Sequence, residues 1–216
     1  MNDDVHRLSP PKQARALVTR TKIVDAAVTC LAELGHAGAS TTAIAKKAGV
    51  SQGALFKHFP TKPTLLAAAT DKTFRSMRQR FVRELIERRV EGRELEVGLE
   101  ILWEIYRDAR LKAVFELYLV TRTDEALRRV LEPVVTEHFV GIMEIAGVLF
   151  PGFVGSAPFH QAVMSLMLTL QGAALMDGVV PAEIRTQLPI DFFVETARVF
   201  LGSPDVDALT MKMGEI

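Results

Sequence analysis

Residues 21–66 read TKIVDAAVTCLAELGHAGASTTAIAKKAGVSQGALFKHFPTKPTLL, and this stretch decides the fold of the N-terminal third of the chain. Its first part places four apolar side chains along one face of a helix: Ile23, Ala27, Cys30 and Leu34. A glycine directly after such a stripe is typical of a helix end, so we expect the helix to stop at Gly35. The cysteine lies on the stripe and is interpreted as a small core residue.

Two shorter helices are expected next, because start and stop signals follow one another closely. Ser40 and the two threonines after it suit the start of the first, which ends at Gly49. Ser51 can cap the second, which covers residues 52–59 and is stopped by Pro60. Two short helices joined by a glycine-containing turn form the plan of a helix-turn-helix.

The second short helix has two different faces. Leu55 and Phe59 are four residues apart and point inward, whereas Gly53 and Lys57 lie on the opposite, outward side. A face that combines a glycine with a lysine can approach DNA closely, and such a helix fits the major groove. Directly after it, Lys62 stands at the start of another helix, where free backbone N–H groups suit a phosphate.

The whole stretch resembles the DNA-binding domain of the TetR family of transcriptional regulators. The matching positions keep the family's spacing and are Leu34-Gly35, Thr41-Thr42, Ile44-Ala45, Ala48-Gly49-Val50-Ser51, Gly53, Leu55-Phe56, His58-Phe59, Lys62 and Leu65. The resemblance implies an all-α protein of about nine helices, with an N-terminal three-helix helix-turn-helix domain followed by a helical ligand-binding and dimerisation domain. We expect a flexible arm at 1–18, the DNA-binding domain at 19–66 and the second domain at 67–216.

The resemblance also implies which side chains contact DNA. The family's contacts fall on Thr42, Gln52, Gly53, Ala54, Phe56, Lys57 and His58, with Lys62 holding a phosphate. Phe56 stands where tyrosine is usual and retains only apolar contact, while Lys57 replaces a frequent aromatic residue and adds a charge. Pro63 replaces a common acidic residue at the start of the fourth helix. For His58, an interpretation as a packing or capping residue stands equal to DNA contact.

The charge of the chain is unevenly distributed. The 26 basic and 26 acidic residues cancel, which taken alone argues against a polyanionic partner. Residues 1–75, however, hold 11 of the basic and 5 of the acidic residues, a net charge of +6, and the remainder carries −6. Such asymmetry is typical of a basic, polyanion-facing module joined to a second part. Three cations of this module can either contact the DNA backbone or stay solvated: Arg15, Arg20 and Lys22.

The C-terminal two-thirds is predicted to be helical, near 64–89, 95–109, 111–121, 124–149, 159–177 and 190–201. The last two predicted helices contain FHQAVMSLMLTLQGAALMDG (159–178) and FFVETARVFL (192–201), and both are apolar on more than one face. A helix that is apolar nearly all round must be buried on both sides. In the resembling family the two C-terminal helices form the dimer interface, which implies a homodimer reading a palindromic operator on double-stranded DNA.

Aromatic and thioether side chains gather in the middle of this second region. The residues expected to contact a small-molecule effector are Trp103, Tyr106, Arg107, Phe115, Tyr118, Phe139, Met143, Met164, Met167 and Gln171. Further polar groups at hand are Glu104, His138 and His160. Because polar groups are few, an apolar or aromatic ligand is favoured. The alternative is that these residues form plain core, although the family's habit of binding an inducer between the central helices supports a pocket.

Several classes of protein are excluded by composition. A single cysteine rules out a disulfide framework or a multi-cysteine metal site and indicates a reducing compartment. The first twenty residues hold no apolar signal segment, and the longest apolar-rich stretch, 162–175, is too short to span a bilayer. We therefore expect a soluble cytoplasmic protein without membrane contact, cofactor or metal.

The leading hypothesis is a homodimeric transcriptional repressor that a small apolar or aromatic ligand releases from its operator. One alternative is a helical protein-interaction module that has lost DNA binding, an interpretation supported by Phe56 and the neutral total charge. The other is an all-α enzyme that uses an apolar cavity. An enzyme is not expected, because the sequence shows no P-loop and no nucleophile elbow, and its five histidines are scattered.

Overall fold

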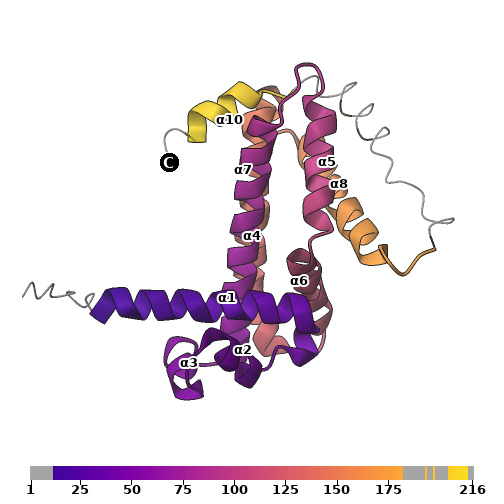
Figure 1. The fold of residues 1–216 in the computed structure, drawn as a ribbon. Helices are drawn as coiled ribbons and strands as arrows, with labels where there is room; N and C mark the ends of the chain where they lie inside the picture. Colours follow the sequence, from indigo (N-terminus) through magenta and orange to yellow (C-terminus); the bar gives the residue numbers. More distant parts are fainter. Residues whose placement is uncertain (1–11, 182–192, 194–196, 198–203, 214–216) are drawn as a thin grey trace, which may run out of the picture.

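The computed structural model describes residues 12–181, 193, 197 and 204–213, and every regular element among them is a helix (Figure 1). The N-terminal unit consists of α1 (Lys12–Gly38), α2 (Thr41–Ala48) and α3 (Gln52–His58). The long helix α4 (Lys62–Glu87) leads from this unit into the body. The body contains α5 (Glu94–Tyr106), α6 (Ala109–Val120), α7 (Glu125–Leu149), η1 (Pro151–Phe153), α8 (Ala157–Met176) and α10 (Val206–Met213). The all-α prediction is confirmed.

Helix α1 starts earlier than the sequence pattern indicates. Residues 12–18 were expected to belong to a flexible arm, but they form the first two turns of α1, which project beyond the rest of the unit (Figure 1). They show no apolar stripe because they have nothing to pack against: Leu17 and Val18 are exposed. Once the packed part of a helix exists, adding further residues requires no new nucleus, so good helix formers extend it.

The predicted helix starts and stops in the N-terminal unit are confirmed by their caps. Gly35 has φ 66°, a left-handed conformation that interrupts α1 where the break was expected. The hydroxyl of Ser40 accepts from the backbone N–H of Ala43 at 3.1 Å, and the hydroxyl of Ser51 accepts from that of Ala54 at 3.1 Å. Thr61 forms a capping box with Thr64 at the start of α4.

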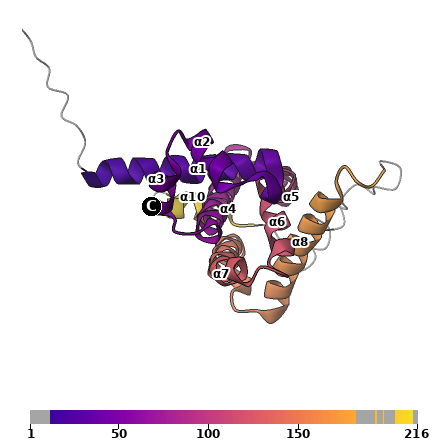
Figure 2. The ribbon, with the colours of Figure 1, turned by 90° about the horizontal axis from the view of Figure 1, so that it is seen from below.

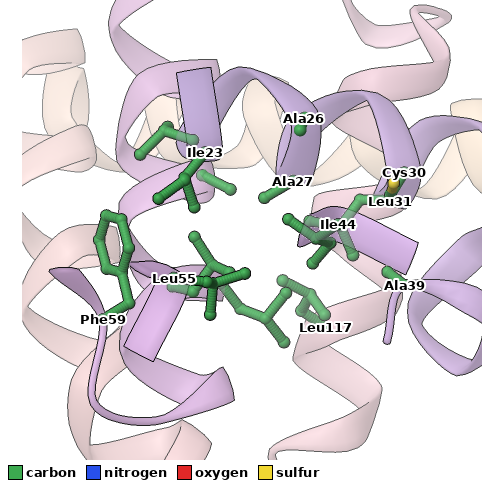
Figure 3. Packing of buried hydrophobic residues seen from close by; sticks show 14 of the residues in the cluster. Ile23, Ala26, Ala27, Cys30, Leu31, Ala39, Ile44, Leu55, Phe59 and Leu117 are labelled. Carbon is green, nitrogen blue, oxygen red and sulfur yellow. The ribbon is translucent and has the colours of Figure 1, made fainter. Parts of the chain in front are cut away.

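The N-terminal unit encloses a core of buried hydrophobic side chains (Figure 3). Its fully buried side chains include Ile23, Ala27, Ile44, Leu55 and Leu65, and Cys30 is buried among them as expected. Leu34 is different: expected on the buried stripe, it is 52% exposed, because α1 breaks directly after it. The body contributes to this core as well, through Ala113 and Leu117 of α6 and Leu127 and Leu131 of α7.

A second core lies further along α4. It is formed by Phe74, Met77 and Leu85 of α4 together with residues of α5, α6, α7, α8 and α10. Of the predicted helix 190–201, only positions 193 and 197 are among the described residues, and both are helical. The sequence pattern missed α10, which starts two residues after Pro204. None of the helices in the described part of the chain combines the length and apolar composition needed to cross a membrane.

Candidate nucleic-acid interface and cavity

Helix α3 presents a small polar and aromatic surface to solvent. Leu55 and Phe59 are buried against the N-terminal core, as predicted. On the other side Gln52, Gly53 and Lys57 are exposed, and the ring of Phe56 is 41% exposed. The remaining two expected DNA contacts on α3, Ala54 and His58, are half-buried at the margin of this face. The structure thus brings the outward side chains of α3 together as the sequence predicts.

Thr42 is joined to this face by a side-chain hydrogen bond. The Nε2 amide of Gln52 donates to Oγ1 of Thr42 at 2.5 Å, which links the first turn of α3 to the first turn of α2. Both residues are exposed, so the pair lies at the surface. The bond holds the Gln52 side chain in one orientation, which lowers the conformational entropy it would lose on contacting a partner.

The N-terminal unit carries several cations that have no counter-ion among the described residues. Several lysines near the N-terminal core are neutralised: Lys47 pairs with Glu33, and Lys72 pairs with Asp25. In the described part of the chain no ion pair engages Lys46, Lys57, Arg15 or Lys22. The guanidinium of Arg20 lies 5.0 Å from the centroid of the Phe59 ring, which places this cation of α1 beside the C-terminal end of α3. Uncompensated positive charge is therefore present on all three helices of the N-terminal unit.

Lys62 does not occupy the position expected of a phosphate clamp. Its ammonium donates to the backbone carbonyl of His36 at 3.2 Å, and the side chain is half-buried. Burial lowers the pKa of this ammonium, partly offset by the carboxylate of Asp124. In this structure the ammonium therefore holds the α1–α2 connection, and its contact with a DNA phosphate stays a prediction. The sequence motif predicts a lysine at this helix start but cannot show which way its long side chain turns.

The same connection is held from the body by α6, a contact that sequence reasoning missed. The backbone N–H of His36 donates to Oε2 of Glu116 at 3.1 Å. A Cβ at Gly35 would lie 3.1 Å from the same oxygen, so glycine both permits the positive φ and leaves room for the carboxylate. The backbone of His36 is therefore held by two other helices: α6 accepts from its N–H, and α4 donates to its carbonyl.

The body contains an apolar cavity of ≈ 550 Å³, which is lined by residues of α4, α5, α7, η1 and α8 together with Phe193, Ala197 and Pro204. This volume lies within the usual range for small-molecule sites. Its walls are mostly aliphatic and phenylalanine side chains, among them Phe81, Leu99, Leu102, Ile142, Phe159 and Leu166. Polar side chains are few and include Arg78, Glu94 and Ser156. The arrangement can enclose a small, largely apolar molecule.

The residues expected to line a pocket mostly lie elsewhere. Among the described lining residues, Met167 alone belongs to the ten expected from the sequence. Tyr106 and Phe115 are buried core residues, and the Tyr106 hydroxyl donates to the sulfur of Met167 at 3.0 Å, behind the cavity wall. Met143 borders a smaller hollow next to η1. The rest are outside the cavity lining: Trp103, Arg107, Tyr118, Phe139, Met164 and Gln171.

The expected residues and the cavity lining differ because aromatic residues signal packing and ligand contact equally well. Trp103 is half-buried with the Arg107 guanidinium 5.7 Å from its ring centroid, and Arg107 pairs with Asp177 at 3.0 Å. On α5 the cavity is faced instead by Leu95, Gly98, Leu99 and Leu102, a stripe at helical spacing. Aliphatic side chains are common in every core, so no local pattern distinguishes a stripe that faces a cavity from one that packs against another helix.

A buried polar group, His138, stands beside the cavity. The ring is 4% exposed and stacks on Phe74, with centroids 3.7 Å apart and planes 4° from parallel. Burial, together with the cationic charge of Arg78, lowers the pKa of His138 to about 3. Nη1 of Arg78 lies 2.9 Å from Nδ1 of His138. Because arginine can only donate, Nδ1 accepts and the ring is neutral at neutral pH.

Known proteins share both the motif and the fold. The sequence profile of the tetR family of bacterial regulatory proteins matches residues 23–69. An uncharacterized HTH-type transcriptional regulator of Mycobacterium tuberculosis is 30% identical over 175 residues, covering 79% of this chain and 88% of the relative. The HTH-type transcriptional regulator CymR of Pseudomonas putida is 31% identical over 124 residues, covering 56% of this chain and 61% of CymR.

Solved structures agree in fold. The multidrug binding protein EbrR, complexed with imidazole, superposes with a TM-score of 0.62 at 20% identity and covers 91% of this chain and 98% of its own. The fatty acid degradation regulator FadR from Bacillus halodurans superposes with a TM-score of 0.56 at 20% identity, with coverages of 85% and 95%. Together with the capped α2–α3 unit and its cation-rich surface, these matches show that the chain is a DNA-binding transcriptional regulator and belongs to the tetR family.

Proposed function

We propose that this regulator is a cytoplasmic homodimeric repressor, which binds a palindromic operator through α3 and leaves it when a small apolar ligand fills the cavity. The observation that carries the proposal is the course of α4. Its first turns pack into the N-terminal core, through Leu65 and Leu66, and its later turns line the cavity, through Met77 and Phe81. One continuous helix therefore joins the cation-rich unit to the empty space in the body.

On the DNA side, α3 lies in the major groove. Lys57 contacts a phosphate or a guanine edge, and the exposed ring of Phe56 contacts a thymine methyl. Gly53 permits close approach, and Gln52 reads a base edge from the orientation that Thr42 maintains. Ala54 and His58 complete the contact at the margin. Lys62 acts indirectly, by holding the α1–α2 connection through His36.

The homodimer forms through the C-terminal helices. Helix α8 lies at the edge of the body (Figure 2) and carries an exposed stripe at helical spacing: Ser165, Leu168, Gly172 and Leu175. Leu168 is 57% exposed and Leu175 41%, although leucine is normally buried. A second copy that covers this stripe removes apolar area from water, and Gly172 allows close approach of the partner helix. Pairing two copies supplies the second half-site that a single helix-turn-helix lacks.

Ligand release needs differential binding to two states of the dimer. A ligand that binds more tightly when the two α3 helices are wrongly spaced shifts the population toward that state, and the ratio of its two affinities sets the extent of release. Helix α4 is one physical connection. Helix α6 is another, because Leu117 packs into the N-terminal core while Leu111 and Phe115 pack into the core next to the cavity.

DNA binding is tested with duplexes selected from a random pool by the full-length protein. We expect a two-fold symmetric consensus and an affinity that falls steeply with salt, because lysine contacts to phosphate release counter-ions. Placing the selected site in a promoter upstream of a reporter distinguishes repression from activation. Failure to enrich any duplex would favour the alternative of a protein-interaction module without DNA binding.

The dimer is tested by sedimentation of a charge substitution on the exposed stripe. Leu168→Glu should yield monomers and lose operator binding, because it places a charge in the proposed interface. Leu119→Glu on α6 is the matched control, since Leu119 is 72% exposed outside α8. A Leu168→Glu variant that remains dimeric would overturn this interface.

A further inference from the structure

The wall of the cavity contains an unpaired guanidinium. Arg78 is half-buried, lines the cavity, and has no carboxylate of the described residues at ion-pair distance. Its neighbours on α4 differ: Arg75 pairs with Asp71 at 2.8 Å, Arg80 pairs with Glu84 at 2.6 Å, and Arg83 is exposed to water. A cation withdrawn from water without a counter-ion costs free energy, so its retention beside an apolar space requires a reason.

Three carboxylates, those of Glu137, Asp71 and Glu144, act on Arg78 at longer range but form no ion pair with it. Asp71 and Glu137 both pair with Arg75, and Glu144 of α7 is exposed. Glu94, the acidic residue in the cavity wall, has its own cation, because Nε of Arg89 lies 3.8 Å from its carboxylate. Arg78 is therefore the charged side chain without an ion pair among the described lining residues.

Two features hold this guanidinium in place before any ligand arrives. Its Nη1 donates to the neutral, buried His138 ring at 2.9 Å. A Cβ at Gly141 of α7 would lie 2.8 Å from Nε of Arg78, so the glycine provides the slot through which the side chain passes. Burial lowers the pKa of the guanidinium, yet arginine remains charged at neutral pH. Preorganisation of this kind reduces the entropy lost on binding.

We infer that the effector of the proposed repressor is an organic monocarboxylate, whose carboxylate pairs with Arg78 while its apolar body fills the cavity. This inference rests on the proposed function for its regulatory meaning, but the binding preference stands by itself. Arg78 is the sole basic side chain among the described lining residues, and Glu94 shares the wall, so a dianion would lack the cations it needs. A cationic ligand would meet like charge at Arg78.

The preference is measured by calorimetry on the full-length protein without DNA. The ligands are decanoate, decan-1-ol and decylamine, which share one hydrocarbon chain, and 4-phenylbutyrate with its alcohol and amine as the aromatic series. We expect each carboxylate to bind about tenfold or more tightly than its alcohol and its amine, because a charge-assisted hydrogen bond to a desolvated guanidinium is stronger than a neutral one.

Substitutions at Arg78 separate charge from shape. Arg78→Met should abolish the preference for decanoate while leaving the affinity for decan-1-ol within about twofold, and Arg78→Lys should retain part of the preference because it keeps the charge but loses the planar fork. Arg83→Met, on the exposed side of the same helix, is the matched control and should bind like the wild type.

The outcomes distinguish this inference from the proposed function. Equal affinities for decanoate and decan-1-ol, a preference that survives in Arg78→Met, or no binding of either series would overturn the carboxylate assignment. Operator release is measured in parallel. If decanoate binds through Arg78 without releasing the operator, the release mechanism fails and the carboxylate site stands. If decan-1-ol binds and releases the operator as well as decanoate does, release stands and the carboxylate assignment falls.

Discussion

The two halves of α4 pack into interiors of opposite character. Near its start, Leu65 and Leu66 belong to a core of fully buried side chains that holds α3 with its outward face exposed. Further along, Phe81 and Leu85 border a cavity of ≈ 550 Å³. A close-packed core resists compression, so a displacement on one side of it is passed to the other side. A core that contains a cavity can change its packing when a ligand fills the cavity. The difference indicates a stiff DNA-binding unit and a body whose packing is completed by a bound ligand.

The two regions are nevertheless not independent. Leu117 from α6 and Leu127 and Leu131 from α7 are buried in the N-terminal core, so that core extends beyond the boundary expected at residue 66. The division at 66 and 67 remains a prediction about domains, but the packing crosses it.

The same substitution in the two interiors should have unequal costs. Leu55→Ala removes a fully buried side chain from the filled core and should lower the free energy of unfolding by about 2–5 kcal/mol. Leu102→Ala removes a half-buried side chain that already faces empty space, and we expect a loss of about 1 kcal/mol. Urea unfolding followed by circular dichroism measures both. Equal losses would show that the cavity wall is packed as tightly as the N-terminal core.

The joint between the regions should be weakened by Glu116→Ala. The substitution leaves the backbone N–H of His36 without its acceptor and should cost about 1–2 kcal/mol of unfolding free energy. Hydrogen exchange at the His36 amide should accelerate. Glu116→Gln is the control, because its amide oxygen still accepts and exchange should stay close to the wild-type rate. Unchanged exchange in Glu116→Ala would mean that α6 does not restrain the α1–α2 connection.

The buried imidazole of the body should make stability depend on pH. The pKa of His138 is about 3 in the folded protein against an ordinary 6.5, so the unfolded chain takes up the proton first. Stability is therefore lost as the pH falls below 6.5, by about 1.4 kcal/mol between pH 7.5 and 5.5. His138→Asn keeps an acceptor for Arg78 but does not titrate. The unfolding free energy of this variant should therefore fall by about 1.4 kcal/mol less than that of the wild type between pH 7.5 and 5.5. His160→Asn, an exposed histidine of the same region, should behave like the wild type.

The smallest expected effect concerns one surface charge of the N-terminal unit. Lys57→Ala should weaken binding to the selected operator about fivefold and reduce the slope of log affinity against log salt by about 1, because one phosphate contact is lost. Fluorescence anisotropy over a salt series measures both quantities. Arg83→Ala removes an exposed cation from the body and should leave DNA binding unchanged. Unaltered affinity in Lys57→Ala would contradict the assignment of the α3 face.

The N-terminal unit was predictable because its signals are local. Hydroxyl caps, glycine stops and the alternation of inward and outward side chains act within one or two turns, so Ser51, Gly49 and Leu55 lie where their spacing indicates. The exceptions involve long side chains or unpacked helix. Lys62 turns inward to His36, and α1 continues to Lys12 without an apolar face, since nothing in the local pattern specifies either.

The helical class, the capped α2–α3 unit and the outward face of α3 follow from local sequence, because helix periodicity and capping depend on neighbours a few residues away. The position of the cavity and the charge that faces it depend on how distant segments pack together. Leu102 and Arg78 line the cavity while Tyr106 packs behind it, because the cavity lies between segments from distant parts of the chain. The residue pattern of a single helix therefore cannot predict a cavity that lies between several helices.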